Sequence, residues 1–256
     1  MTQRRPGFPA RLDLPAAARR PGSVVSAAAS ARHAQPSGVG LDSQAVRARM
    51  VRKLAEQGIS DPAVLAAMSA VERHGFVDTA LINQAYEDTS LPIGLGQTIS
   101  TPSVVARMIE LLLGAGRQAD GRLGRVLEIG TGCGYQAAVL SQVATEVYSI
   151  ERLRGLHDKA RENLRPYRLA NVHLLFGDGM AGYAKGAPYA GIIAAAGGDA
   201  LPLAWTEQLA LGGRMIAPTQ MASGQQALVV VDKTPQGLKQ TVLEAVHFVP
   251  LKSGIA

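Results

Sequence analysis

The sequence predicts an α/β fold: a doubly wound, Rossmann-like sheet of seven mostly parallel strands, with an antiparallel C-terminal hairpin and an N-terminal helical extension. Three observations predict it. An apolar run at 126–129 ends in glycines at every second position. Candidate strands and helices alternate from Arg125 onward, which is typical of a parallel sheet covered by helices on both faces. Glu151 and Asp178 stand at the ends of the second and third candidate strands.

Residues 1–40 form a basic segment ahead of the predicted fold. Six arginines and one aspartate give it a net charge of +5, so only +1 of the chain's +6 remains for the other residues. The segment is rich in Ala, Arg, Pro and Ser, and its low apolar content predicts a disordered tail. An organellar transit peptide and an upstream-extended reading frame are the alternatives. Since the rest of the chain is nearly neutral, we expect no nucleic-acid partner.

The remaining residues, 41–256, are expected to form a single domain. Residues 41–120 read as mainly helical, and residues 121–256 carry the sheet. The chain has one cysteine, which excludes an internal disulfide and, without a signal-peptide pattern, favours a reducing compartment. The apolar stretches are shorter than the ~18 residues that a membrane span needs. We therefore expect a cytoplasmic monomer that makes no membrane contact.

Three helices are expected before the sheet. The first covers 43–57 and stops at Gly58, because glycine commonly ends helices. Asp61-Pro62 provides a cap and a first-turn proline for the second. After a loop-rich stretch at 72–78, Thr101-Pro102 opens the third.

Seven strands follow in the second half of the chain. The candidates are 125–129, 146–150, 172–176, 189–195, 213–217, 226–232 and 241–249. Only Lys233–Leu238 separates the last two. Without room for a helix between them, they are expected to pair as an antiparallel hairpin at a sheet edge.

The glycine motif at 130–134 indicates the class of ligand. A dinucleotide loop has the pattern G-x-G-x-x-G, but here Tyr135 takes the place of its last glycine. The shorter G-x-G-x-G pattern fits a ligand without a pyrophosphate, such as S-adenosylmethionine. Glu151 lies 21 residues after Gly130, where a carboxylate binds ribose hydroxyls in nucleoside-binding folds. Taken singly, the glycines suit a structural turn and the acids a solvated loop, but together and in order they predict an adenosyl site.

Further motifs extend the pattern, and with them the chain resembles the protein-L-isoaspartate (D-aspartate) O-methyltransferase family over residues 42–256. Glu72–Val77 is similar to the segment ahead of the family's substrate loop, Leu91–Ser100 to its signature loop, and Glu244–Leu251 to its C-terminal strand. The signature loop is the specific match, because many methyltransferases share the glycine motif. The resemblance implies an S-adenosylmethionine-dependent methyltransferase fold. It also implies methylation of the free carboxylate of L-isoaspartyl and D-aspartyl residues in damaged proteins, which starts repair through a succinimide.

The resemblance also assigns site residues. It places a catalytic hydroxyl at Ser100, which would orient the carboxylate. Because Ser100 directly precedes Thr101-Pro102, free N–H groups at that helix start are also expected to face the anion. The expected cofactor contacts are Thr98, Ile99, Glu128, Gly130, Thr131, Gly132, Gly134, Glu151, Asp178 and Gly179. From sequence alone, an N-terminal cap is the commoner role for a serine such as Ser100. No general base is needed, because a carboxyl group with a pKa near ~4 is ionised at neutral pH. No metal is expected, since no ligand spacing indicates one.

The chain departs from the family pattern at several positions. Ala190 stands where an Asp is common, the turn at 194–202 lacks the usual Thr and Pro-rich sequence, and Thr219-Gln220 replaces Val-Gly. These departures leave two alternatives open. One is a homologue that methylates a different carboxylate or a small molecule; the other is a non-catalytic cofactor-binding module. A nicotinamide oxidoreductase and a nucleic-acid methyltransferase are less favoured, because the motifs typical of each are missing.

Overall fold

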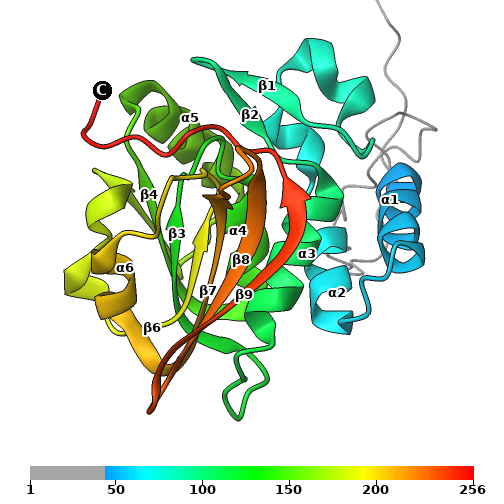
Figure 1. Cartoon of the computed structure of the whole chain (residues 1–256). Coiled ribbons are helices and arrows are strands. Elements are labelled where there is room, and N and C mark those ends of the chain that lie inside the picture. Colours follow the sequence, from blue (N-terminus) through cyan, green and yellow to red (C-terminus); the bar gives the residue numbers. More distant parts are fainter. Residues whose placement is uncertain (1–43) are drawn as a thin grey trace, which may run out of the picture. The chain divides into compact units, whose positions relative to one another are not determined.

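The computed structural model describes residues 44–256, which belong to one compact unit (Figure 1). The expected tail at 1–40 lies outside the described residues. Within 44–256, no helix combines the length and the apolar character that a membrane span requires.

The main sheet has seven strands, in the order β5-β4-β3-β6-β7-β8-β9. They are β3 (Leu123–Ile129), β4 (Ala144–Glu151), β5 (Val172–Phe176), β6 (Tyr189–Ala194), β7 (Leu209–Gln220), β8 (Gln226–Thr234) and β9 (Gly237–Val246). All neighbouring pairs are parallel except β7–β8 and β8–β9, which are antiparallel. The predicted fold and terminal hairpin are therefore confirmed. β9 starts and ends earlier than expected, so residues 247–249 lie beyond it.

The region before the sheet contains α1 (Gln44–Glu56), α2 (Pro62–Ala70) and α3 (Pro102–Leu113), close to their predicted bounds. Asp61 caps α2 by accepting hydrogen bonds from the N–H groups of Ala63 and Val64. The expected loop at 72–78 contains a 3₁₀ turn, η1 (Arg73–Phe76), and is followed by η2 (Thr79–Gln84). The signature loop forms a two-stranded hairpin, β1 (Leu91–Gly94) and β2 (Gln97–Ile99), which the sequence patterns did not reveal.

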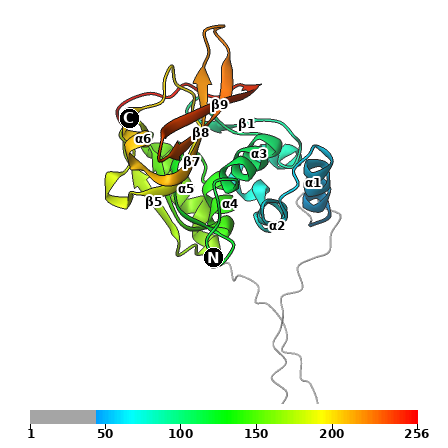
Figure 2. The same cartoon turned by 60° about the horizontal axis from the view of Figure 1, so that its bottom comes forward.

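Helices cover the two faces of the sheet unequally. α3, α4 (Tyr135–Val143) and α5 (Arg154–Leu164) pack on one face, with α2 against α3 and α4. α6 (Leu203–Gln208) lies on the other face. The chain runs from β3 to β4 in one direction across the sheet and from β6 to β7 in the opposite direction, and because such crossovers are right-handed, their helices lie on opposite faces. Three short 3₁₀ turns complete the second half: η3 (Arg165–Tyr167), η4 (Gly179–Ala181) and η5 (Ala184–Gly186). Figure 2 shows α1 and α2 on the outside of this helical layer.

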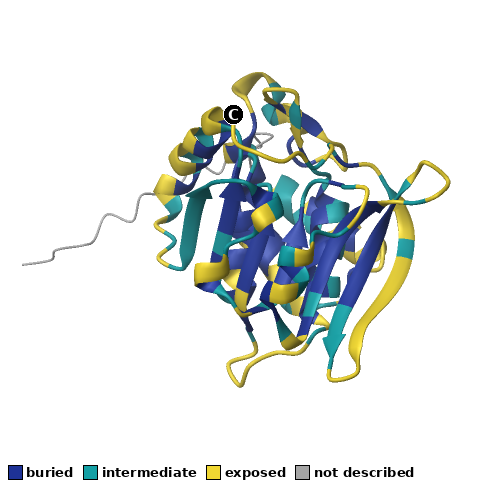
Figure 3. Cartoon of the chain, turned by 60° about the vertical axis from the view of Figure 1, so that its left-hand side comes forward, coloured by how far each residue is buried: buried dark blue, intermediate teal, exposed yellow. Residues whose placement is uncertain are grey.

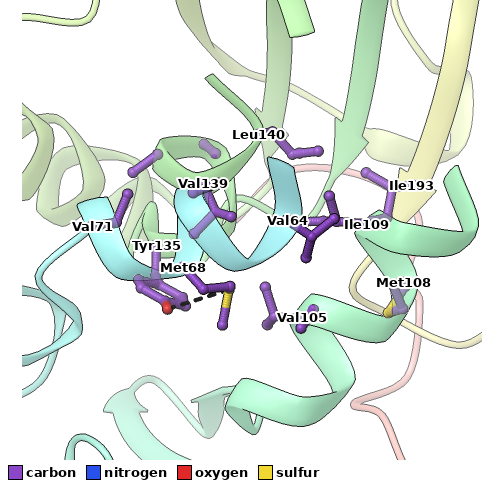
Figure 4. Packing of buried hydrophobic residues seen from close by; sticks show 14 of the residues in the cluster. Val64, Met68, Val71, Val105, Met108, Ile109, Tyr135, Val139, Leu140 and Ile193 are labelled. Atoms are coloured by element: carbon purple, nitrogen blue, oxygen red, sulfur yellow. Dashed lines mark hydrogen bonds between the residues drawn. The ribbon is translucent and has the colours of Figure 1, made fainter. Parts of the chain in front are cut away.

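The larger hydrophobic core lies on the face with more helices. In Figure 4, Val64 and Met68 of α2 meet Val105 of α3 and Val139 of α4, and all four are buried. Each such side chain stabilises the fold by roughly 1.5–3 kcal/mol through burial. The smaller cluster on the other face includes Trp205. Figure 3 shows the inner strands buried and β9 exposed, so the centre of the sheet is buried and its β9 edge is in contact with solvent.

Candidate active site

The candidate site lies at the carboxyl ends of the parallel strands. β3 lies between β4, the next strand along the chain, and β6, to which the chain returns from β5. The strand order therefore reverses beside β3, and such switch points are where open α/β sheets bind ligands. A cavity of about 430 Å³ opens there, a volume in the range of small-molecule sites. Its walls come from the loops after β3 and β4, the β1–β2 hairpin, the turn after β6 and the segment 249–252.

The glycine loop forms the floor of the cavity. Gly130 and Gly132 line it with φ of 91° and 57°, a left-handed region that favours glycine. A Cβ on Gly132 would lie 3.2 Å from Cδ1 of Ile93, so the hairpin approaches the loop closely. Gly134 is outside the cavity lining. It is the N-cap of α4, and a Cβ there would meet Leu164 of α5 at 3.0 Å.

Glu151 holds the glycine loop and faces the cavity. Its Oε2 accepts a hydrogen bond from the N–H of Gly132 at 2.9 Å, and its Oε1 accepts one from the N–H of Leu153 at 2.9 Å. Each carboxylate oxygen can accept a second hydrogen bond. The geometry therefore leaves room for a pair of hydroxyl donors, as on a ribose.

Glu128 lies fully buried beneath the loop and does not line the cavity. The Ser149 hydroxyl donates to it and lies 2.6 Å from the hydroxyl of Thr131, which does line the cavity. Burial raises the pKa of Glu128 to about 8, although the Ser149 hydroxyl and the Gln136 amide favour the charged form. A buried carboxyl group is thus linked to the cavity wall through two hydroxyls.

The end of β5 contributes Gly179, which lines the cavity, and Asp178, which does not. Asp178 accepts hydrogen bonds from the N–H groups of Met180 at 2.9 Å and Gly254 at 2.7 Å, so it anchors the C-terminal segment. The indole of Trp205 donates to the carbonyl of Gly179 at 2.8 Å. Sequence reasoning would assign Trp205 to packing alone, and no sequence signal indicates this link to the site.

Thr98, Ile99 and Ser100 line the cavity from the hairpin side. Thr101, not Ser100, caps α3, because its side chain accepts from the N–H of Val104. The Ser100 hydroxyl has no hydrogen-bond partner among residues 44–256. The structure thus rules out the capping role for Ser100 and leaves its hydroxyl available in the cleft.

The N–H groups at the start of α3, expected to bind the acceptor carboxylate, already have partners. The N–H of Ser103 donates to Asp88 at 2.9 Å, and that of Val104 donates to Thr101 Oγ1 at 3.3 Å. Pro102 has no N–H group. That part of the prediction is wrong, because the first-turn donors are already engaged.

Several lining residues have no counterpart in the predicted set. Leu95 projects from the hairpin tip with φ of 52° and is exposed. Lys159 of α5, outside the lining, tethers the hairpin by donating to the carbonyl of Ile93 at 2.9 Å. The segment 249–252 is held at the cavity by two main-chain hydrogen bonds: the N–H of Leu251 donates to the carbonyl of Gly197 at 2.7 Å, and the N–H of Gly197 donates to the carbonyl of Val249 at 2.9 Å. These contacts join residues far apart in sequence, so no local motif signals them.

Among the residues that the structure describes, histidine, cysteine and metal-binding groups do not provide reactive side chains at this cavity. None of the four histidines in the described part of the chain lines the cavity. Cys133 does line it, but burial raises the pKa of its thiol to about 11, so the thiol is neutral. Within residues 44–256, no cluster of three or more His, Cys, Asp or Glu side chains has a metal-binding arrangement.

Sequence comparisons give a consistent result. The family model described as protein-L-isoaspartate(D-aspartate) O-methyltransferase (PCMT) matches residues 45–256. A protein-L-isoaspartate O-methyltransferase of Methylibium petroleiphilum is 57% identical over 261 aligned residues, covering 97% of this chain and 96% of the relative. A protein of the same name from Leptothrix cholodnii is 58% identical, covering 94% of this chain and 85% of the relative.

Solved structures also match. A protein-L-isoaspartate O-methyltransferase aligns with a TM-score of 0.73 and 30% identity, over 82% of this chain and 67% of the other. A Plasmodium falciparum protein described by the same activity, solved with S-adenosyl-L-homocysteine, aligns with a TM-score of 0.69 and 22% identity. It covers 80% of this chain and 98% of its own, and at that identity it supports the fold alone.

Proposed function

The chain belongs to the protein-L-isoaspartate(D-aspartate) O-methyltransferase family, and we propose that its cleft methylates the free carboxylate of L-isoaspartyl and D-aspartyl residues in damaged proteins and peptides. The methyl donor of the reaction is S-adenosylmethionine. The observation that carries the proposal is the unbonded hydroxyl of Ser100, which faces the same cavity as the glycine loop and Glu151. One cleft therefore presents both an adenosyl site and a donor for an anionic acceptor.

The cavity residues fit the proposed cofactor. Gly130 and Gly132 present bare backbone to the cavity, and Glu151 has acceptor capacity left for ribose hydroxyls. Gly179 and the apolar side chains of Ile150 and Leu156 line the same space, as an adenine ring requires. S-adenosylmethionine, when bound, supplies a methyl group made electrophilic by its sulfonium. Among the remaining assigned residues, we propose that Glu128, Gly134 and Asp178 support the cofactor site from behind its wall.

Ser100 is proposed to orient the acceptor carboxylate by donating a hydrogen bond to one oxygen. The carboxylate is ionised at neutral pH, so the residues around it need only position it. Correct positioning of two reactants can contribute about 7–11 kcal/mol to lowering a barrier. The absence of histidines from the lining of the described cleft is compatible with such chemistry. The methyl ester product would then close to a succinimide, and hydrolysis would return part of it to normal aspartate.

The unusual turn at 194–202 bears on the acceptor. Ala195 and Ala196 line the cavity, and Gly198 is bridged to Thr219, one of the atypical residues. Ala190 lies within β6, away from the cavity lining. We therefore propose that the turn and Thr219 affect peptide preference and that Ala190 does not.

The deciding experiment uses radiolabelled S-adenosylmethionine and two peptides that differ only in Asp versus isoAsp. Base-labile methyl incorporation into the isoAsp peptide alone is the expected result. Incorporation into neither peptide, with the cofactor still bound in calorimetry, would favour a different carboxylate substrate or a non-catalytic module. Incorporation into a non-peptide carboxylate would identify the first of these.

The setting of the enzyme is also proposed. We propose that residues 41–120 form the acceptor side of one domain and residues 121–256 its cofactor side. We further propose a cytoplasmic monomer that acts on damaged proteins and makes no use of nucleic acid or membranes. Size-exclusion chromatography with light scattering would test the monomer.

A further inference from the structure

Arg73 is a buried cation without an acidic partner. Its side chain is fully shielded from solvent, and no ion pair within 4.0 Å involves it among residues 44–256. A buried charge without a counter-charge is strongly destabilising unless something compensates it. Burial lowers the pKa of Arg73 below its ordinary value, but arginine stays protonated in proteins. The fold therefore tolerates a full positive charge at this point.

The guanidinium joins three segments at the wall of the cleft. Its Nε donates to the carbonyl of Ala85 at 2.8 Å, and Nη2 donates to the carbonyl of Ser100 at 2.7 Å. Its central carbon lies 4.9 Å from the ring centroid of Tyr135, the residue that follows the glycine loop. Nη1 has no hydrogen-bond partner in the described part of the chain. Arg73 thus fixes the main chain of Ser100 relative to the glycine loop.

The charge lies directly behind the cavity. Ser100, Cys133 and Tyr135 all line the cavity. The guanidinium donates a hydrogen bond to the carbonyl of Ser100 and interacts electrostatically with Tyr135 and Cys133. The groups that face it electrostatically are the Tyr135 hydroxyl, the Cys133 thiol and, more weakly, the Asp88 carboxylate. Asp88 already accepts hydrogen bonds from Ser103 and Gln57. In a low-dielectric wall, such a charge acts on the cavity with little screening.

We propose that Arg73 is a positioning residue that sets the Ser100 main chain and whose uncompensated charge selects an anionic methyl acceptor. The inference rests on the proposed function, because it names the counter-charge as the acceptor carboxylate. Hydrogen bonds to neutral carbonyl groups alone do not require a charged side chain. An acceptor carboxylate bound beside Ser100 requires a cation nearby, because it would otherwise lose its hydration without a compensating charge.

The test compares the binding of two peptides in the presence of S-adenosylhomocysteine, so that no methyl transfer occurs. One peptide carries isoAsp, and the other has the free carboxylate replaced by a carboxamide. The protein variants are Arg73→Gln, which removes the charge, and Arg73→Lys, which keeps it without the planar fork. We expect Arg73→Gln to weaken binding of the isoAsp peptide by about tenfold or more and to leave carboxamide binding unchanged. Arg73→Lys should keep the preference for the anionic peptide; in a separate turnover assay with S-adenosylmethionine it should lower kcat, because Ser100 is less firmly held.

Arg122→Gln is the matched control for lost stability. Arg122 also donates to buried carbonyls, for example that of Ser141 at 2.7 Å, and its Nε also lacks a partner in the described residues. It directly precedes β3 and is outside the cavity lining. Thermal unfolding and S-adenosylhomocysteine affinity of each variant report whether the fold and cofactor site persist. An unchanged peptide preference in both Arg73 variants would overturn the inference. Failure of the unaltered enzyme to bind or methylate the isoAsp peptide would instead overturn the proposed function.

Discussion

Two parts of the cleft wall differ in how they are held. The cofactor wall, defined by Gly130, Gly132 and Glu151, is fixed by contacts within 21 residues of chain, such as the Gly132–Glu151 hydrogen bond across 19 positions. The acceptor wall, defined by Ser100 and the β1–β2 hairpin before it, depends on distant residues; Thr98 and Ile99 of that hairpin are the residues expected to border the cofactor as well. Arg73 holds the carbonyl of Ser100 from 27 positions away, and Lys159 holds the hairpin at Ile93 from 66 positions away.

The difference has a physical consequence. The cofactor wall comes with the parallel sheet, because adjacent strands β3 and β4 bring its parts together. The acceptor wall is a short hairpin outside that sheet, and a two-stranded hairpin is marginally stable by itself. Its geometry must come from side chains of the elements around it. The two walls should therefore respond separately to mutation.

The largest effect is expected for Ser100→Ala. It removes the hydrogen-bond donor proposed for the acceptor carboxylate, and loss of one such donor lowers kcat by about 100- to 1000-fold in comparable sites. Cofactor affinity, measured by calorimetry, should be unchanged, because the cofactor wall does not use this hydroxyl. Ser103→Ala, on the neighbouring turn of α3 and outside the cavity lining, is the control. Nearly full activity in Ser100→Ala would remove Ser100 from the mechanism.

Glu151→Ala should give the converse pattern. It leaves the N–H groups of Gly132 and Leu153 without their acceptor, and each buried unpaired group costs about 1–3 kcal/mol. We expect the S-adenosylmethionine Kd to rise about 100-fold, while the peptide KM at saturating cofactor stays the same. Glu146→Ala, at the other end of β4, removes an equal charge from an exposed pair with Arg125 and should change neither value. Equal losses in both substrates would mean that the walls are not separable.

A smaller effect is expected from Glu128, beneath the cofactor wall. Its pKa of about 8 in the folded protein exceeds its ordinary value of 4.5, so between these values the folded state holds a proton that the unfolded chain has released. The stability contributed by this group is complete below pH 4.5 and is lost as pH rises to about 8. The slope is at most about 1.4 kcal/mol per pH unit. Denaturant unfolding of Glu128→Gln, which stays neutral, should lack this component; parallel pH profiles for the two proteins would contradict it.

The same contrast explains how far the sequence could predict the molecule. The seven strands and their terminal hairpin follow from apolar runs and spacing, since parallel sheets need buried strands separated by helices. Glu151 could be located because the register of adjacent parallel strands places it beside the glycine loop. The cofactor wall is thus encoded over a short stretch of chain.

The acceptor wall could be found only through resemblance. Nothing in the pattern around 91–100 predicts a hairpin, and η1 reads as a loop because its short turn has no amphipathic period. Arg73, Trp205 and the segment 249–252 act through contacts that form only when the chain has folded. Their roles depend on tertiary packing, which local propensity does not contain.

Lys159→Met gives the smallest and most selective change. The variant keeps much of the aliphatic length of Lys159 but loses its hydrogen bond to Ile93 and its ion pair with Asp78, both at 2.9 Å. Because Asp78 is largely exposed, the ion pair contributes at most about 1 kcal/mol. Loosening of the hairpin should raise the peptide KM by less than about tenfold and leave the cofactor Kd unchanged. Lys185→Met, which removes the same charge from η5, controls for charge alone. A cofactor Kd that rises together with the peptide KM would show that the hairpin also supports the cofactor wall, through the close approach of Ile93 to Gly132.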